Sequence, residues 1–324
     1  MIIKLFHYLV IVFAAFAALT QFIAHRTKRL FPPEGKFVDI GSDRLHYVEY
    51  GEGPPIVFVH GLCGNLRNFA YLDLQRLAKS HRVILVDRPG SGRSTRGPRS
   101  AANVYAQART IAMFIVTLGL DKPVVVGHSL GGAIALALAL DHPQILSRVA
   151  LISPLTHVET EAPGPFRGLA IRFALVRRFV SLTLGVPVAK LQSRKATELI
   201  FSPEPVPYDF GLKGGGLTGL RPHAFYSASS DLVAAPEDLP DMESRYASLN
   251  VPVALLHGRN DQILNYQRHA EALKNRLDSV DLRIVDGGHM LPVTQPAETT
   301  DWLLDVAKPS PAAEPKLVAA STAA

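Results

Sequence analysis

A serine between glycines is the first group in this 324-residue chain whose type and setting suggest chemistry. The segment Gly127-His128-Ser129-Leu130-Gly131 follows the apolar run PVVV and precedes the Ala/Leu-rich run AIALALAL. This is G-x-S-x-G between a strand and a helix, where glycines allow a sharp turn that exposes the serine at the end of the strand. The free amides at the start of the helix favour negative charge at the same place. The pattern predicts that Ser129 is a nucleophile rather than a serine in an ordinary turn.

A hydroxyl is a weak nucleophile until a base removes its proton, and two later motifs supply partners for Ser129. His289 follows the last strand-like run in the segment Asp286-Gly-Gly-His289, and we expect it to be the base. Asp261 follows the strand-like run VPVALLH, 28 residues before His289, and a carboxylate there can hold the imidazole in the required tautomer. Asp286 and Glu159 are the rival acids. We favour Asp261, because Asp286 ends the strand that carries the histidine loop and is poorly placed to reach across.

Short apolar, β-branched runs with helical patterns between them would position these groups. Two alternating runs, 36–40 and 44–50, predict a hairpin. Six further runs predict strands buried on both faces, at 55–60, 82–87, 123–128, 148–153, 251–257 and 282–287. Helical patterns lie at about 65–79, 103–119, 131–141, 265–278 and 296–307. The alternation predicts an α/β fold, with a mostly parallel central sheet flanked by helices.

The motifs occur in a fixed order along the chain: HGLCG (60–64), DRPGSGRS (87–94), GHSLGG (127–132), GRND (258–261) and GGHMLP (287–292). Together they resemble the α/β-hydrolase superfamily, in particular its esterase, lipase, haloperoxidase-like and proline-iminopeptidase-like branch. The resemblance covers about 36–308 without much of the segment 155–250. Cys63 stands where related sequences often have proline or glycine. Ser129 stands where epoxide hydrolases and haloalkane dehalogenases have aspartate, which argues against both activities.

The resemblance also implies an oxyanion hole, a pair of backbone amides that stabilise the charge developing on a substrate oxygen. By position, the donors would be the N–H groups of Leu62 and Leu130. The segment 87–94 is interpreted as loop scaffolding near the pocket. No metal-ligand spacing occurs, and the mechanism requires no cofactor and no metal.

The N-terminal segment Leu5–Ala24 is twenty residues without a charge, about the length of a membrane-spanning helix. We expect a single-pass membrane anchor. The alternatives are a signal peptide cleaved after Ala15-Phe16-Ala17, which would give an exported or periplasmic protein, and a buried helix. Arg26, Lys28 and Arg29 outnumber Lys4 across the segment, which weakly favours a cytoplasmic enzyme.

The strand–helix alternation stops after Pro154 and resumes at Val251, which predicts an insertion over the edge of the sheet. We therefore expect five parts: a hydrophobic segment (1–30), two core segments (31–154 and 251–308), a mostly helical cap (155–250) and a disordered tail (309–324). In the cap, Phe166, Leu169, Phe173, Val176 and Val180 would share one face of a continuous helix. A second apolar face would consist of Ile171, Leu175, Phe179 and Leu182. One face can pack on the core, and the other predicts contact with an acyl chain, the bilayer or another cap helix; the alternative is an ordinary covered helix with solvated arginines.

The expected reaction is hydrolysis of an ester by a Ser-His-Asp triad through an acyl-enzyme intermediate. The alternatives are other acyl chemistry on the same triad (amide or C–C bond cleavage, acyl transfer, perhydrolysis) and a non-catalytic sensor on the same fold. The expected partners are a small apolar ester or lipid and the membrane. The net charge of +6 is not gathered into a basic stripe with aromatic residues, so nucleic acid is not expected.

Overall fold

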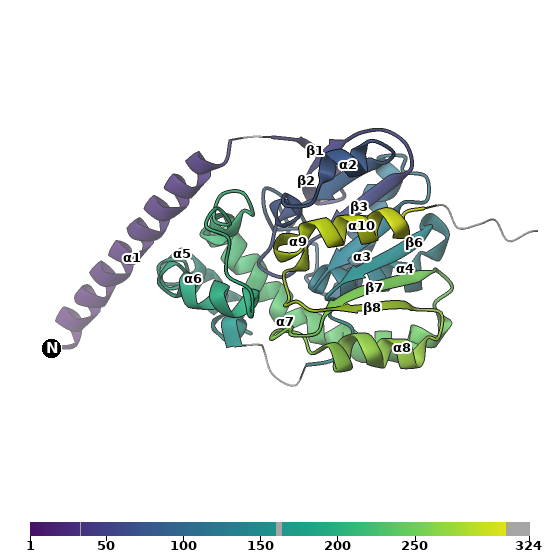
Figure 1. The fold of residues 1–324 in the computed structure, drawn as a ribbon. Helices are drawn as coiled ribbons and strands as arrows, with labels where there is room; N and C mark the ends of the chain where they lie inside the picture. The colour runs from purple at the N-terminus through teal and green to yellow at the C-terminus, as the bar shows by residue number, and fades with distance from the viewer. Residues whose placement is uncertain (33, 160–163, 309–324) are drawn as a thin grey trace, which may run out of the picture.

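One sheet of eight strands forms the centre of the molecule within the described residues 1–32, 34–159 and 164–308 of this computed structural model (Figure 1). The order across the sheet is β1-β2-β4-β3-β5-β6-β7-β8. The strands are β1 (Lys36–Ile40), β2 (Asp43–Tyr50), β3 (Pro55–Val59), β4 (Arg82–Val86), β5 (Val124–His128), β6 (Arg148–Ile152), β7 (Val253–Gly258) and β8 (Asp281–Val285).

The pairing of the strands confirms the predicted architecture. β1 and β2 pair antiparallel, as expected of the hairpin, and β2 also runs antiparallel to β4. From β4 to β8 every neighbouring pair is parallel. All five residues of β5 are buried, which explains why the central strands are apolar runs rather than alternating ones. The carboxyl ends of β5, β7 and β8 therefore meet at one edge of the sheet.

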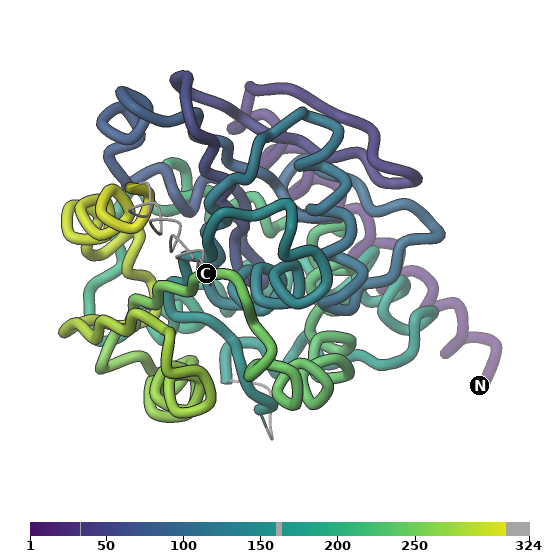
Figure 2. Tube along the Cα trace, turned by 90° about the vertical axis from the view of Figure 1, so that its right-hand side faces the viewer, coloured from purple at the N-terminus to yellow at the C-terminus, as the bar shows by residue number. Residues whose placement is uncertain are grey.

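Helices cover both faces of the sheet (Figures 1 and 2). On one face, Val57 and Val59 of β3 pack in the same core as α3 (Val104–Thr117) and α4 (Leu130–Asp141). On the other face, Phe58 packs in a second core that includes Trp302 of α10 (Pro296–Val306). Helix α4 is apolar on all sides and buried over most of its length, as expected of a helix inside a core.

The shorter helices fill the connections between these elements. They are η1 (Leu66–Phe69), α2 (Leu74–Ala78), η2 (Pro143–Ile145), η5 (Tyr246–Ser248), η6 (Gln267–Glu271), α8 (Ala272–Arg276) and α9 (Leu291–Thr294). The single helix predicted at 65–79 is wrong, because Asp73 begins a new helix there. Its side chain accepts a hydrogen bond from the amide of Arg76.

The segment between β6 and β7 is helical. It contains η3 (Gly164–Leu169), α5 (Ala174–Leu182), α6 (Gly185–Phe201), η4 (Gly216–Gly219) and α7 (Pro222–Arg245). We call these elements the cap, and its boundaries remain a prediction. The continuous helix predicted through Phe166 and Val180 is wrong. The chain breaks between η3 and α5, where the guanidinium of Arg177 donates to the carbonyl of Ile171 instead of lying in solvent.

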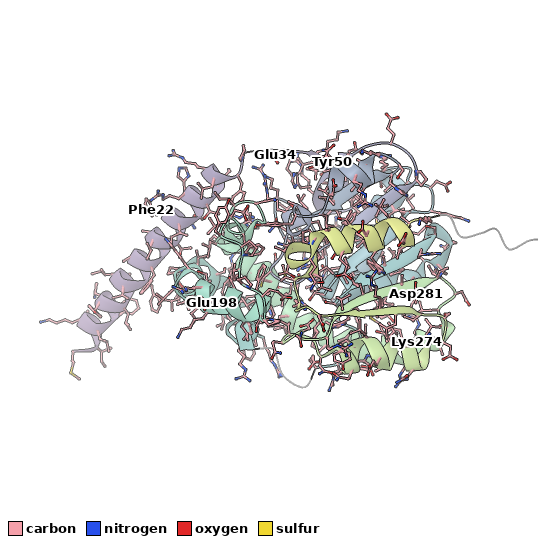
Figure 3. The ribbon with its side chains drawn as sticks, in the orientation of Figure 1. Phe22, Glu34, Tyr50, Glu198, Lys274 and Asp281 are labelled. Atoms are coloured by element: carbon pink, nitrogen blue, oxygen red, sulfur yellow. The ribbon has the colours of Figure 1, made fainter. Side chains whose placement is uncertain are left out.

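Helix α1 (Ile2–Leu30) runs beside the cap (Figure 1). The ring of Phe13 lies 4.9 Å from that of Phe179 on α5, and the hydroxyl of Thr20 donates to the carbonyl of Thr183. Phe22 stands out from the helix with 58% of its surface exposed (Figure 3). By length and composition α1 can cross a membrane, and none of its most apolar window is buried, so the alternative of a buried core helix does not hold. The predicted tail, 309–324, lies outside the described residues.

Candidate active site

Ser129 occupies the turn between β5 and α4 in a backbone conformation that L-residues rarely adopt, with φ 55° and ψ −120°. Such a conformation costs about 1–3 kcal/mol and persists only where the surroundings impose it. Here its amide donates to Ile152 O at 3.1 Å and its carbonyl accepts from Leu155 N at 3.0 Å. A Cβ on Gly131 would lie 2.1 Å from Val59 O, so only glycine lets the helix approach β3 this closely. The turn presents Ser129 at the carboxyl edge of the sheet.

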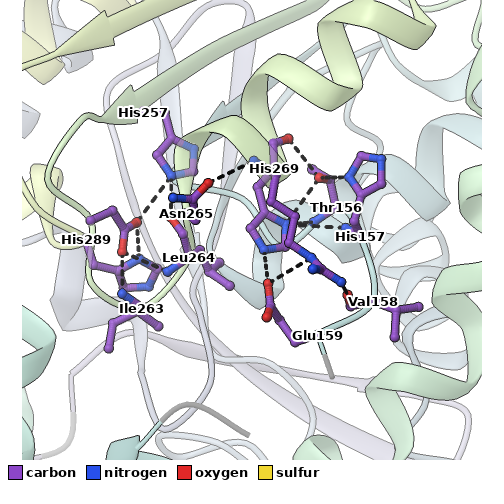
Figure 4. A network of polar contacts seen from close by, with 12 residues as sticks. Thr156, His157, Val158, Glu159, His257, Ile263, Leu264, Asn265, His269 and His289 are labelled. Atoms are coloured by element: carbon purple, nitrogen blue, oxygen red, sulfur yellow. Dashed lines mark hydrogen bonds and ion pairs between the residues drawn. The ribbon is translucent and has the colours of Figure 1, made fainter. Parts of the chain in front are cut away.

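His289 and Asp261 meet at the same edge, on the loops that follow β8 and β7 (Figure 4). Nδ1 of His289 lies 2.7 Å from Oδ2 of Asp261, and both residues are buried. The other carboxylate oxygen accepts the amides of Ile263 at 2.8 Å and Leu264 at 2.9 Å, which fixes the orientation of the carboxylate. His257 Nε2 lies 3.3 Å from Oδ2.

The carboxylate of Asp261 is held in its ionised form. Burial alone would raise its pKa, but the charge of His289 and hydrogen bonds from His257 and His289 outweigh burial. The pKa of Asp261 therefore lies below its ordinary value. A charged carboxylate on Nδ1 leaves Nε2 of His289 free to accept a proton.

The rival acids lie elsewhere. The side chain of Asp286 is 89% exposed and faces Arg259 at 3.5 Å. Glu159 lies 2.6 Å from Nε2 of His269, in a second histidine–carboxylate pair beside the first (Figure 4). Of the three carboxylates, Asp261 is the one that contacts His289.

His128, the residue before Ser129, connects the serine turn to the histidine loop. Its Nε2 lies 2.9 Å from the carbonyl oxygen of His289, and the two rings are 5.0 Å apart. The Ser129 hydroxyl makes no hydrogen bond within the described residues. In unliganded active sites the contact between nucleophile and base is often long and tightens when substrate binds.

Two unpaired amides flank Ser129. Leu130 N–H is at the first turn of α4, where it has no acceptor within the helix. A Cβ built on Gly61 would lie 2.9 Å from Ser129 Cβ, so the peptide group that carries Leu62 N–H passes close to the serine. Neither amide donates a hydrogen bond within the part of the chain that the structure describes.

Arg88 is a residue of the site that the sequence analysis missed. It is fully buried and donates from Nη2 to Gly61 O and from Nε to His60 O, both at 2.9 Å. The Gly61 carbonyl and the Leu62 N–H belong to one planar peptide group and point in opposite directions. By binding the carbonyl, Arg88 fixes the direction of the amide. Its Nη1 lies 2.8 Å from Asp231 on cap helix α7, so we call this contact the Arg88–Asp231 pair.

The sequence indicates that Arg88 could be buried, but it does not indicate the partner of the guanidinium. An arginine between an apolar strand and Pro-Gly is a candidate for burial, and a buried guanidinium requires a partner. Asp231 is 143 residues away, and no local pattern marks it. Arg96 also pairs with Asp231, at 2.6 Å.

Comparisons with known proteins agree with the observed fold. A model of the alpha/beta hydrolase fold family matches residues 54–176. The chain is 39% identical over 122 residues to the dihydrolipoyllysine-residue acetyltransferase component of the acetoin cleaving system of Cupriavidus necator, covering 37% of this chain and only 32% of that protein. It is 27% identical over 240 residues to 2-hydroxy-6-oxononadienedioate/2-hydroxy-6-oxononatrienedioate hydrolase of Burkholderia vietnamiensis, covering 71% of this chain and 80% of that protein.

Solved structures share the fold. The crystal structure of a membrane phospholipase A superimposes with a TM-score of 0.66 and 21% identity over 94% of this chain and 95% of that one. The strand order, the serine turn and these matches lead to one assignment. The chain has the α/β-hydrolase fold.

Proposed function

We propose that the protein is a serine hydrolase that cleaves carboxylic esters, with Ser129 as nucleophile, His289 as base and Asp261 as the orienting acid. The observation that carries the proposal is the 2.7 Å contact between His289 and Asp261, at the sheet edge where the strained turn presents Ser129. A nucleophile, a base and a group that orients the base are the parts that this chemistry requires.

The reaction proceeds in two steps on these residues. His289 Nε2 accepts the Ser129 proton as Oγ attacks the acyl carbonyl, and the Leu62 and Leu130 amides stabilise the resulting oxyanion. His289 then protonates the leaving alcohol, and an acyl-enzyme remains. Water, deprotonated by the same histidine, attacks the acyl-enzyme and releases the acid.

The substrate class that the molecule favours is an apolar ester or a lipid at a membrane. Helix α1 is a candidate membrane anchor, and we propose that it holds the enzyme at the bilayer. Large apolar side chains are exposed beside it on the cap: Phe173 at 77%, Leu175 at 84% and Leu191 at 85%. Isolated exposed residues are ordinary, but several in one segment next to an apolar helix indicate an apolar environment.

A second candidate is hydrolysis of a carbon–carbon bond with the same three residues. The Burkholderia relative is a hydrolase named for hydroxy-oxo diacids. Such compounds contain no ester or amide, so their hydrolysis must cleave a carbon–carbon bond.

An acyl-substrate panel with product analysis separates the two candidates. We expect esters of increasing acyl length to give an acid and an alcohol, with an initial burst as the acyl-enzyme accumulates. The 2-hydroxy-6-oxo diacid should remain intact. Cleavage of the diacid without turnover of any ester would contradict the ester proposal, and Ser129→Ala is the control for contaminating esterase.

A further inference from the structure

A large cavity lies apart from the candidate active site. Its volume is about 1380 Å³, and neither Ser129, Asp261 nor His289 lines it. Its walls come from the C-terminal end of α1, the loop after β4, helix α5 and the start of α7. It is large enough for a ligand of lipid-headgroup size or more.

Cationic side chains dominate the lining. Seven arginine and lysine side chains face two carboxylates, those of Glu34 and Asp87. Both carboxylates already have partners. Glu34, where the chain passes from α1 to the sheet (Figure 3), pairs with Arg67 at 2.9 Å. Asp87 lies 2.8 Å from His46 and also accepts backbone amides.

Five of the cations have no carboxylate partner within the described residues: Lys28, Arg93, Arg177, Arg178 and Arg221. Arg93 and Arg221 donate only to backbone carbonyls, of Phe31 at 2.7 Å and of Thr218 and Gly92 at 2.7 and 2.6 Å.

Two further observations concern the cations of the lining. Burial, together with the charge of Arg93, lowers the pKa of Arg221 against the opposing effect of Asp87. In addition, the buried Nε of Arg96, another lining residue, has no hydrogen-bond acceptor. Cations that outnumber the carboxylates around a cavity are stabilised by an anion inside it.

We propose that this cavity binds an anion that carries a phosphate group. Two sources can supply such an anion: the headgroup of a membrane phospholipid and a free phosphate compound. Guanidinium groups match phosphate oxygens in pairs, and a lysine adds a point charge. The lipid source follows from the position of the cavity. The charge-free span Leu5–Ala24 ends four residues before Lys28, which places Lys28 at headgroup level when α1 spans a bilayer. The site shares no residue with the proposed triad, so the two proposals stand or fall separately.

The test uses the full-length protein in a neutral detergent. The probes are short-chain phosphatidylglycerol and phosphatidylcholine, both ether-linked so that an esterase cannot consume them, and inorganic phosphate. Native mass spectrometry counts bound lipid, and calorimetry measures phosphate. The test variant is Lys28→Gln/Arg178→Gln, since neither side chain makes a hydrogen bond or ion pair with any residue that the structure describes. The matched control is Arg26→Gln/Arg172→Gln, which removes the same charge from neighbouring positions outside the cavity.

We expect phosphatidylglycerol to bind more tightly than phosphatidylcholine. Its dissociation constant should rise about tenfold or more in Lys28→Gln/Arg178→Gln and less than about twofold in the control. If Lys28→Gln/Arg178→Gln loses lipid binding only, the bound anion is a lipid headgroup. If it loses binding of inorganic phosphate, the bound anion is a soluble phosphate compound. If no probe binds, or if both double variants weaken binding equally, the proposal is wrong.

Discussion

Replacing Asp261 by asparagine tests the proposed acid, because the surroundings of this side chain dictate how an amide would sit. Oδ1 accepts the amides of Ile263 and Leu264 at 2.8 and 2.9 Å, so the asparagine oxygen must take that place. The amide NH₂ then takes the place of Oδ2, 2.7 Å from Nδ1 of His289. Nδ1 would have to accept rather than donate, which places the proton of His289 on Nε2.

A proton on Nε2 prevents His289 from taking the proton of Ser129. The loss of the correct tautomer in a serine–histidine–aspartate triad lowers kcat by about 10⁴-fold, or about 5.5 kcal/mol in the barrier. Asp286→Asn is the matched control, because its side chain is 89% exposed and its pair with Arg259 is worth at most about 1 kcal/mol. We expect it to change kcat by less than about threefold.

The assay is the steady-state hydrolysis of a soluble short-chain ester, with circular dichroism to show that both variants are folded. Asp261→Asn with more than a tenth of the wild-type kcat would refute the tautomer argument. A loss confined to Asp286→Asn would move the acid to Asp286 and leave the fold assignment intact.

Three further predictions concern stability and location. Asp231→Asn should lower the free energy of unfolding by about 3–5 kcal/mol in urea, because it leaves the buried Arg88 without its carboxylate, whereas Asp238→Asn on the same helix should cost about 1 kcal/mol. Burial and the charge of His289 lower the pKa of His128 to about 3, so the unfolded chain, with a histidine pKa of about 6.5, binds the proton more tightly. The contribution of His128 to the free energy of unfolding should therefore be constant above pH 6.5 and fall by up to about 1.4 kcal/mol per pH unit toward pH 3. The total free energy of unfolding should accordingly fall less steeply with decreasing pH in His128→Gln than in the wild type, and equal slopes would contradict this. Deleting residues 1–24 should move the protein from the membrane to the soluble fraction on sedimentation, with hydrolysis of a soluble ester within about threefold of the full chain.

The core of the fold could be predicted because its information is local. Each central strand is a short apolar run, and both faces are buried, as the five buried residues of β5 illustrate. The break before α5 could not be predicted, because it depends on the long side chain of Arg177. That side chain reaches back to Ile171 and across to the hydroxyls of Ser229 and Ser230 on α7. A helical wheel contains no such contact.

In the site, too, the local motifs could be predicted from the sequence and the long-range contacts could not. The glycines around Ser129 indicate its sharp turn directly, since a Cβ at Gly131 would collide with β3. The Arg88–Asp231 pair joins segments 143 residues apart, and the cavity at the C-terminal end of α1 gathers cations from five segments. Only the folded chain brings such residues together.

Labelling with a fluorophosphonate shows whether Ser129 is an activated nucleophile, because this reagent requires a serine activated by a base. We expect one label per chain, on the peptide that contains Ser129, and loss of both label and ester turnover in Ser129→Ala. A label on another residue, or ester hydrolysis retained by pure Ser129→Ala protein, would contradict this expectation.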